Sequence, residues 1–118
     1  MVEAVGFDIE ISNRLHPGLW KMVLKSAEKM WLDKAILPDQ QVQWAALFFS
    51  AKEAFYKFQY SLTKQWLGFQ DVEIKLNERP SQQGSFTVFV EKDRYPIVHP
   101  IVGKYVFFKR YVATGIIR

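Results

Sequence analysis

The segment from Gln40 to about Trp66 constrains the fold more than any other part of the chain. Its apolar residues recur at steps of three and four, the spacing of one helix face. The stripe consists of Leu47, Ala51, Phe55, Phe58 and Leu62. We expect this helix to end at Gly68. Because a helix of this length presents a long apolar face, the rest of the chain must provide a surface that covers it.

The segments on both sides of this helix have strand patterns. From Val5 onward, apolar residues alternate with acidic ones, and the turn-forming residues 77–84 separate two later alternating segments as a long hairpin loop would. The predicted strands cover 5–11, 72–76, 85–91, 104–108 and 111–117. One strand, then helices, then several strands predict an α+β fold in which an antiparallel sheet packs against the long helix.

Shorter helices are expected between the first strand and the long helix. Pro17 can begin one, Ser26 is a candidate cap for a second through residues 27–32, and Asp39 is a candidate N-cap after Pro38. The four tryptophans lie at predicted helical positions, where core packing is the default role. The two histidines, His16 and His99, lie next to prolines and far apart, which favours structural roles.

Composition excludes several classes of protein. The chain has 118 residues, which suits one domain, and its 49% hydrophobic and 24% charged content argues against disorder. It has no cysteine, so disulfides and thiolate chemistry are excluded and a reducing cytoplasm is favoured. No apolar run approaches the ~20 residues of a membrane span. The net charge of +4 is compatible with an acidic partner, and 16% aromatic content is high for so small a domain.

Asp8 and Glu10 form the first candidate site. Residues two apart on a strand project from the same face, while Phe7, Ile9 and Ile11 would project from the other. Two carboxylates ~4 Å apart repel by on the order of 4 kcal/mol at an effective dielectric of about 20. A shared proton, a basic neighbour or a hard cation such as Mg²⁺ would offset that repulsion. The alternative is a solvated strand face with no chemical role.

Lys52, Glu53 and Lys57 form the second candidate site. Glu53 and Lys57 are four apart and share a helix face. The cluster is either an ordinary surface ion pair or a carboxylate for a metal flanked by cations for phosphate.

Together these two segments resemble a known family. GFDIE at 6–10 and WAALFFSAKEAFYK at 44–57 are similar to the two signature motifs of the 4′-phosphopantetheinyl transferase superfamily. FSAKEAFYK, together with FQDVEI at 69–74 and YVATGII at 111–117, resembles its enterobactin-synthetase type. Ser50 stands where some members have tryptophan. The resemblance covers nearly the whole chain.

The resemblance implies Mg²⁺-dependent transfer of 4′-phosphopantetheine from coenzyme A to a serine of a carrier protein, that is, holo-acyl-carrier-protein synthase activity. It implies that Asp8, Glu10 and Glu53 hold Mg²⁺, and that Lys52 and Lys57 contact phosphate. Glu53, or a water held by Glu10, would take the serine proton. The carrier, and whether its pathway makes a siderophore or another secondary metabolite, stay open.

Enzymes of this type are pseudodimers of two similar halves, and this chain opens at the Asp motif where the second half would begin. A Ser-His motif of the first half, which grips the nucleotide end of coenzyme A, has no counterpart here. We therefore expect residues 1–118 to be one domain, the C-terminal half of a two-domain enzyme. A homo-oligomer that completes the site across an interface and an inactive copy are the alternatives.

Two other classes of function stay open at this stage. A non-catalytic interaction module would take up neither Mg²⁺ nor coenzyme A. A small basic nucleic-acid-binding domain would use the alternation of aromatic and basic residues between Tyr105 and Tyr111. We expect neither nucleic acid nor membrane as a partner, because the charge is modest and no segment could span a bilayer.

Overall fold

The computed structural model describes residues 2–97 and 100–118, so His99 lies outside the described residues. The chain forms a five-stranded antiparallel sheet with the order β1-β5-β4-β3-β2. Its strands are β1 (Val5–Ile11), β2 (Val72–Leu76), β3 (Gln83–Val90), β4 (Ile101–Phe108) and β5 (Tyr111–Ile117). The α+β prediction is confirmed, and each predicted strand is present with its ends shifted by three residues or fewer.

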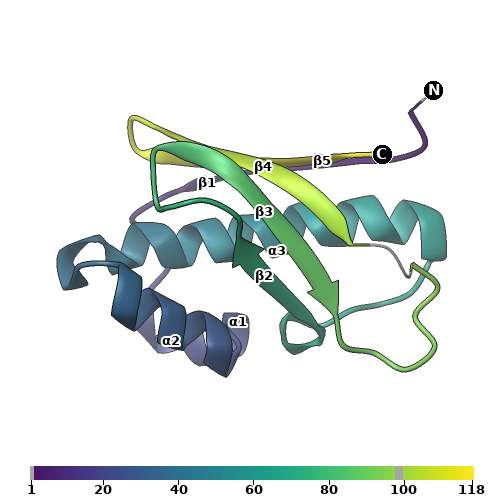
Figure 1. The fold of residues 1–118 in the computed structure, drawn as a ribbon, viewed down its shortest axis with the longest axis horizontal. Coiled ribbons are helices and arrows are strands. Elements are labelled where there is room, and N and C mark those ends of the chain that lie inside the picture. Colours follow the sequence, from purple (N-terminus) through teal and green to yellow (C-terminus); the bar gives the residue numbers. More distant parts are fainter. Residues whose placement is uncertain (1, 98–99) are drawn as a thin grey trace.

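The long helix lies along one face of the sheet (Figure 1). This helix, α3 (Gln41–Thr63), packs mainly against β1 and β5, while α1 (Trp20–Val23) and α2 (Ser26–Ala35) lie at one end of the molecule. Short 3-10 turns, Pro17–Leu19, Pro38–Gln40 and Phe69–Asp71, precede α1, α3 and β2. Within the described residues, none of these helices is both long and apolar enough to cross a membrane.

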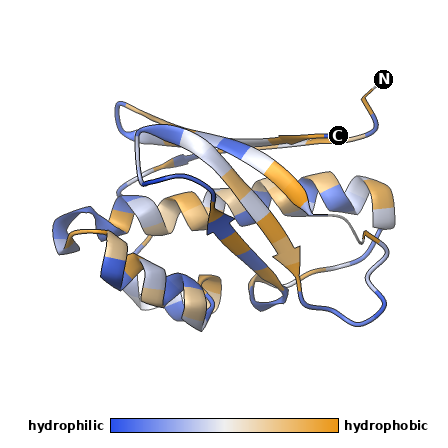
Figure 2. Ribbon diagram, viewed as in Figure 1, coloured by the Kyte–Doolittle hydropathy of each residue, from blue (hydrophilic) through white to orange (hydrophobic). Residues whose placement is uncertain are grey.

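The predicted stripe of the long helix is confirmed. Leu47, Ala51, Phe55 and Phe58 are fully buried against the sheet, whereas Leu62 in the last turn is partly exposed. Apolar and polar residues can be followed as they alternate along β2 in Figure 2, as expected for a strand with one face on the core. The core therefore lies between α3 and the inner face of the sheet.

Several predicted helix ends are wrong. The long helix ends at Thr63, because Lys64 adopts the left-handed conformation (φ 57°) and no glycine is needed there. Gly68 instead precedes the Phe69–Asp71 turn. Ser26 is the first residue of α2 rather than its cap, and Asp39 lies inside a 3-10 turn.

The structure also corrects one expectation for the tryptophans and supports one for the histidines. Trp66 is 69% exposed, because the helix ends before it, whereas Trp44 is buried. The His16 ring accepts a hydrogen bond from the backbone N–H of Gly18, a structural role as expected.

The alternation of β1 has an unusual polarity. Asp8 and Glu10 turn toward α3, while Phe7 and Ile9 are 55% and 62% exposed on the outer face of the sheet. The strand thus presents its acids inward and its apolar residues outward. This inversion places two carboxylates against the long helix and leaves an uncovered apolar surface on the opposite side.

Candidate active site between β1 and α3

A glycine allows β1 to approach α3 closely. A Cβ atom on Gly6 would lie 2.0 Å from the carbonyl oxygen of Ala54 and 2.8 Å from the Cβ of Phe58. Any other residue would therefore force the strand away from the helix. The glycine of the first motif thus sets the spacing between the strand that carries Asp8 and the helix that carries Glu53.

Two buried hydroxyl groups connect β1 and β5 to α3 next to Asp8. The Oγ of Ser50 lies 2.8 Å from Thr114 Oγ1 on β5 and donates to the backbone oxygen of Asp8 at 3.4 Å. Thr114 Oγ1 also donates to the backbone oxygen of Ser50. Ser50 therefore holds the backbone of β1 at Asp8 against α3.

The structure brings Asp8 and Lys57 into direct contact. Lys57 Nζ lies 3.1 Å from Asp8 Oδ1 and donates to the backbone oxygen of Phe7. The Asp8 side chain is 8% exposed, whereas that of Lys57 is 53% exposed. The cation therefore neutralises a buried carboxylate from the solvent side and can move away when another cation replaces it.

Glu10 and Glu53 complete the cluster. Partial burial and the adjacent carboxyl groups of Asp8 and Glu53 raise the pKa of Glu10 to about 7, against the opposing charge of Lys57. Partial burial and then the charge of Asp8 raise the pKa of Glu53. Both shifts indicate carboxylates that lack sufficient positive charge.

The donor set fits a hard divalent cation. Asp8 Oδ2 is buried and has no hydrogen-bond partner among the described residues. Carboxylate oxygens are the ligands that Mg²⁺ prefers, and it retains several waters. Within residues 2–97 and 100–118, however, no three side chains form a ready-made metal cage. The assignment of Asp8, Glu10 and Glu53 as metal ligands stays a prediction, which the unpartnered Asp8 oxygen favours.

Lys52, the other predicted phosphate ligand, is not brought to this cluster. Its side chain is 1% exposed, and its ammonium forms an ion pair with Glu28 on α2. The three N–H groups already have three protein acceptors, from Glu28, Val23 and Phe69. Contact between Lys52 and phosphate stays a prediction that this geometry does not favour.

A pocket of about 310 Å³ opens beside Glu53. Its walls combine aromatic and aliphatic side chains with the two adjacent charged residues of α3. They are Lys52, Glu53, Tyr56, Trp66, Leu67, Gly68, Phe69 and Val72. The pocket thus places an apolar surface next to the carboxylate cluster.

Glu28 was not identified from the sequence, although the position of Lys52 on the apolar face of the long helix indicates a buried acidic partner. Lys52 occupies a row with the buried residues Phe48, Phe55 and Gln59, at helical steps of four, three and four. A lysine within such a row needs a buried acidic partner, and only tertiary contact reveals which acid that is.

Two of the aromatic residues between Tyr105 and Tyr111 pack into the core. Tyr105 is buried, and Phe107 is half-buried with its ring 5.0 Å from that of Trp44. These rings serve the core, so the alternation with basic residues does not favour base stacking.

Comparisons with known proteins agree with this geometry. A family model described as the 4′-phosphopantetheinyl transferase superfamily matches residues 4–113. The chain belongs to this superfamily.

Individual relatives point the same way. Over 73 residues the chain is 36% identical to the 4′-phosphopantetheinyl transferase PptT of Mycobacterium tuberculosis, covering 62% of this chain and 31% of that protein. Over 100 residues it is 32% identical to the 4′-phosphopantetheinyl transferase Svp of Streptomyces mobaraensis, covering 85% and 37%. The matched segments thus span about a third of the length of these relatives.

The fold also resembles a solved structure. The holo-[acyl-carrier-protein] synthase of Thermotoga maritima superposes with a TM-score of 0.68 at 22% identity, covering 99% of this chain and 63% of that one. This similarity supports the predicted fold.

Proposed function

We propose that this chain takes part in the Mg²⁺-dependent transfer of 4′-phosphopantetheine from coenzyme A to a serine of an acyl or peptidyl carrier protein. One observation carries the proposal: the cluster of Asp8, Glu10, Glu53 and Lys57, in which a buried oxygen of Asp8 has no hydrogen-bond partner within residues 2–97 and 100–118. Phosphoryl transfer depends mainly on positioning and charge stabilisation, which such a cluster can provide.

Each residue of the cluster has a role in this proposal. Asp8, Glu10 and Glu53 would hold Mg²⁺, which would neutralise charge on the pyrophosphate of coenzyme A. Lys57 is half-exposed and can turn from Asp8 to a phosphate oxygen. Glu53, or a water held by Glu10, would accept the proton of the carrier serine. The serine oxygen then attacks the phosphorus next to pantetheine, and the bond to the nucleotide phosphate breaks.

The apolar pocket beside Glu53 suits the uncharged arm of coenzyme A. A pyrophosphate held at the carboxylates would lie at the mouth of a cavity walled by Tyr56, Leu67 and Phe69. An arm lying there would keep the phosphorus next to the carboxylates.

The outer face of the sheet suits a second domain. Apolar residues on β1, β4 and β5 gather on this face around Lys104, since the strand register places them on neighbouring strands. They include Val5, Phe7, Ile9, Val102, Phe108 and Ile117, all between 41% and 62% exposed. Because the matched relatives are about twice as long as this chain, we propose that the other half of such an enzyme covers this face.

The test is incubation of the chain with coenzyme A, Mg²⁺ and an apo carrier protein, read by mass spectrometry of the carrier. We expect the carrier to gain the mass of phosphopantetheine only when Mg²⁺ is present. Glu53→Gln should abolish the gain. If the chain alone is inactive, adding the first half of a relative as a separate protein should restore it. A carrier unmodified under both conditions contradicts the proposal.

A further inference from the structure

A buried ammonium joins three segments next to the candidate site. Lys52 Nζ donates to Val23 O at 2.6 Å, to Glu28 Oε1 at 2.8 Å and to Phe69 O at 2.9 Å. These acceptors belong to α1, to α2 and to the turn before β2. A single side chain of α3 therefore connects the long helix to all three.

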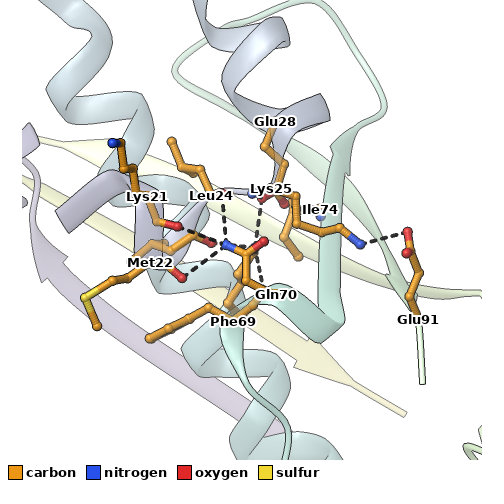
Figure 3. Close-up of polar contacts among 11 residues, drawn as sticks. Lys21, Met22, Leu24, Lys25, Glu28, Phe69, Gln70, Ile74 and Glu91 are labelled. Atoms are coloured by element: carbon orange, nitrogen blue, oxygen red, sulfur yellow. Dashed lines mark hydrogen bonds and ion pairs between the residues drawn. The ribbon is translucent and has the colours of Figure 1, made fainter. Parts of the chain in front are cut away.

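The partner carboxylate extends the same network. Glu28 Oε1 also accepts a hydrogen bond from the backbone N–H of Lys25, and Glu28 Oε2 accepts one from the N–H of Ile74 on β2, both at 2.7 Å. Figure 3 shows the adjoining contacts, in which the amide of Gln70 donates to the backbone oxygens of Lys21, Met22 and Leu24. The turn at 69–71 is thus tied to α1 as well as to α3.

The network forms one side of the candidate site. Lys52 precedes Glu53 in α3, and the segment it holds through Phe69 supplies three residues of the opposite pocket wall, Leu67, Gly68 and Phe69. Lys52 thus fixes both the helix that carries Glu53 and the distance from that helix to the facing wall.

We propose that the Glu28–Lys52 ion pair positions Glu53 relative to the pocket wall formed by residues 67–72, at the spacing that coenzyme A requires. In this proposal Lys52 does not contact phosphate directly. This inference rests on the proposed function, because the pocket matters only if coenzyme A binds there.

The energetics of buried ion pairs support a role in positioning. Breaking such a pair by removing one partner leaves an uncompensated buried charge, whereas replacing both partners by well-packed hydrophobic residues of similar volume is often neutral. Both side chains are 1% exposed and their charged groups lie 2.8 Å apart, so each charge has the other as its partner away from water. Such a pair adds little net stability, but this one connects α1, α2, α3, the 69–71 turn and β2. It is therefore suited to fix the relative positions of these segments.

The test compares Lys52→Met, Glu28→Gln and the double variant Glu28→Gln/Lys52→Met. Two readouts are needed: coenzyme A affinity with Mg²⁺ by calorimetry, and amide hydrogen exchange of residues 66–72. Each single variant should lose roughly 10–100-fold in affinity, the range seen when residues that orient ligating groups are removed. Each should also exchange faster at 66–72. The double variant should recover only part of the lost affinity, because no unpaired charge remains buried but Val23 O and Phe69 O still lack their donor.

A double variant that folds and exchanges like the original chain, yet binds coenzyme A as weakly as Lys52→Met, would overturn the inference, because Lys52 would then contact the ligand directly. Failure of the proposed function is distinguishable, since the original chain would then bind no coenzyme A at all. In that case, unchanged exchange at 66–72 in the single variants overturns the positioning role, and faster exchange in the single variants supports it.

Discussion

Asp8 and Lys57 are 49 residues apart in the sequence, and their side chains meet at 3.1 Å between β1 and α3. This ion pair joins the two motifs at one place. Lys57 covers Asp8 Oδ1 from the solvent side, while Asp8 Oδ2 has no hydrogen-bond partner among the described residues. With Glu10 and Glu53 nearby, the cluster has more carboxylates than Lys57 can balance, and a metal ion would supply the missing positive charge.

The first prediction concerns the close packing of β1 on α3. Gly6→Ala should lower the free energy of unfolding by about 1–3 kcal/mol, because the added methyl overlaps the Ala54 carbonyl. Gly115→Ala is the matched control on the neighbouring strand, where the methyl would meet only the half-exposed ring of Phe7, which can rotate. Urea denaturation measures both, and equal losses would contradict the assigned role of Gly6.

The second prediction concerns the stabilisation of the chain by Mg²⁺. Binding to the folded state alone stabilises by RT ln(1 + [L]/Kd), about 2.7 kcal/mol at 100 times the Kd. The original chain should melt at a higher temperature as Mg²⁺ is added, and Asp8→Asn should abolish this shift. Glu78→Gln is the control, because that acid bonds Ser85 in an exposed turn far from the cluster along the chain. A shift that survives in Asp8→Asn rules out Asp8 as a ligand.

The third prediction concerns the buried hydroxyls. Ser50→Ala or Thr114→Val alone should cost about 1–3 kcal/mol, because each leaves a buried polar partner. The double variant should cost less than the sum of the two, since neither hydroxyl then remains unpaired. Chemical denaturation of the four proteins completes the cycle, and strict additivity would show that the two side chains do not interact.

The fourth prediction concerns the apolar outer face of the sheet. With the other half absent, copies of the chain should associate through it at high concentration. Phe7→Lys/Ile9→Glu should reduce the average mass in light scattering, whereas Lys75→Glu and Thr87→Lys, on the polar part of the same face, should not. A monomer at all concentrations would count against this face as an interface.

Much of the fold could be predicted from the sequence because local patterns determine it. The stripe from Leu47 to Phe58 and the alternation of β1 each have a single regular period. Helix ends could not be predicted equally well, since Lys64 adopts a conformation usually left to glycine. The sequence also could not predict that Asp8 and Glu10 of β1 face α3, because this depends on which face of the sheet the helix covers.

The candidate site was likewise predictable only in part. The spacing of Asp8 with Glu10, and of Glu53 with Lys57, placed each pair on one face, and the family resemblance joined the pairs. The partner of Lys52 could not be found, because Glu28 is 24 positions away on a separate helix and no local period links the two.

Calorimetry of coenzyme A binding with and without Mg²⁺, in the original chain and in Glu53→Gln, tests the proposed site most directly. We predict measurable binding only with Mg²⁺ in the original chain, and none in Glu53→Gln even though that variant keeps its fold. Equal coenzyme A binding by both proteins, whether or not Mg²⁺ is present, would contradict the assignment of this cluster as the active site.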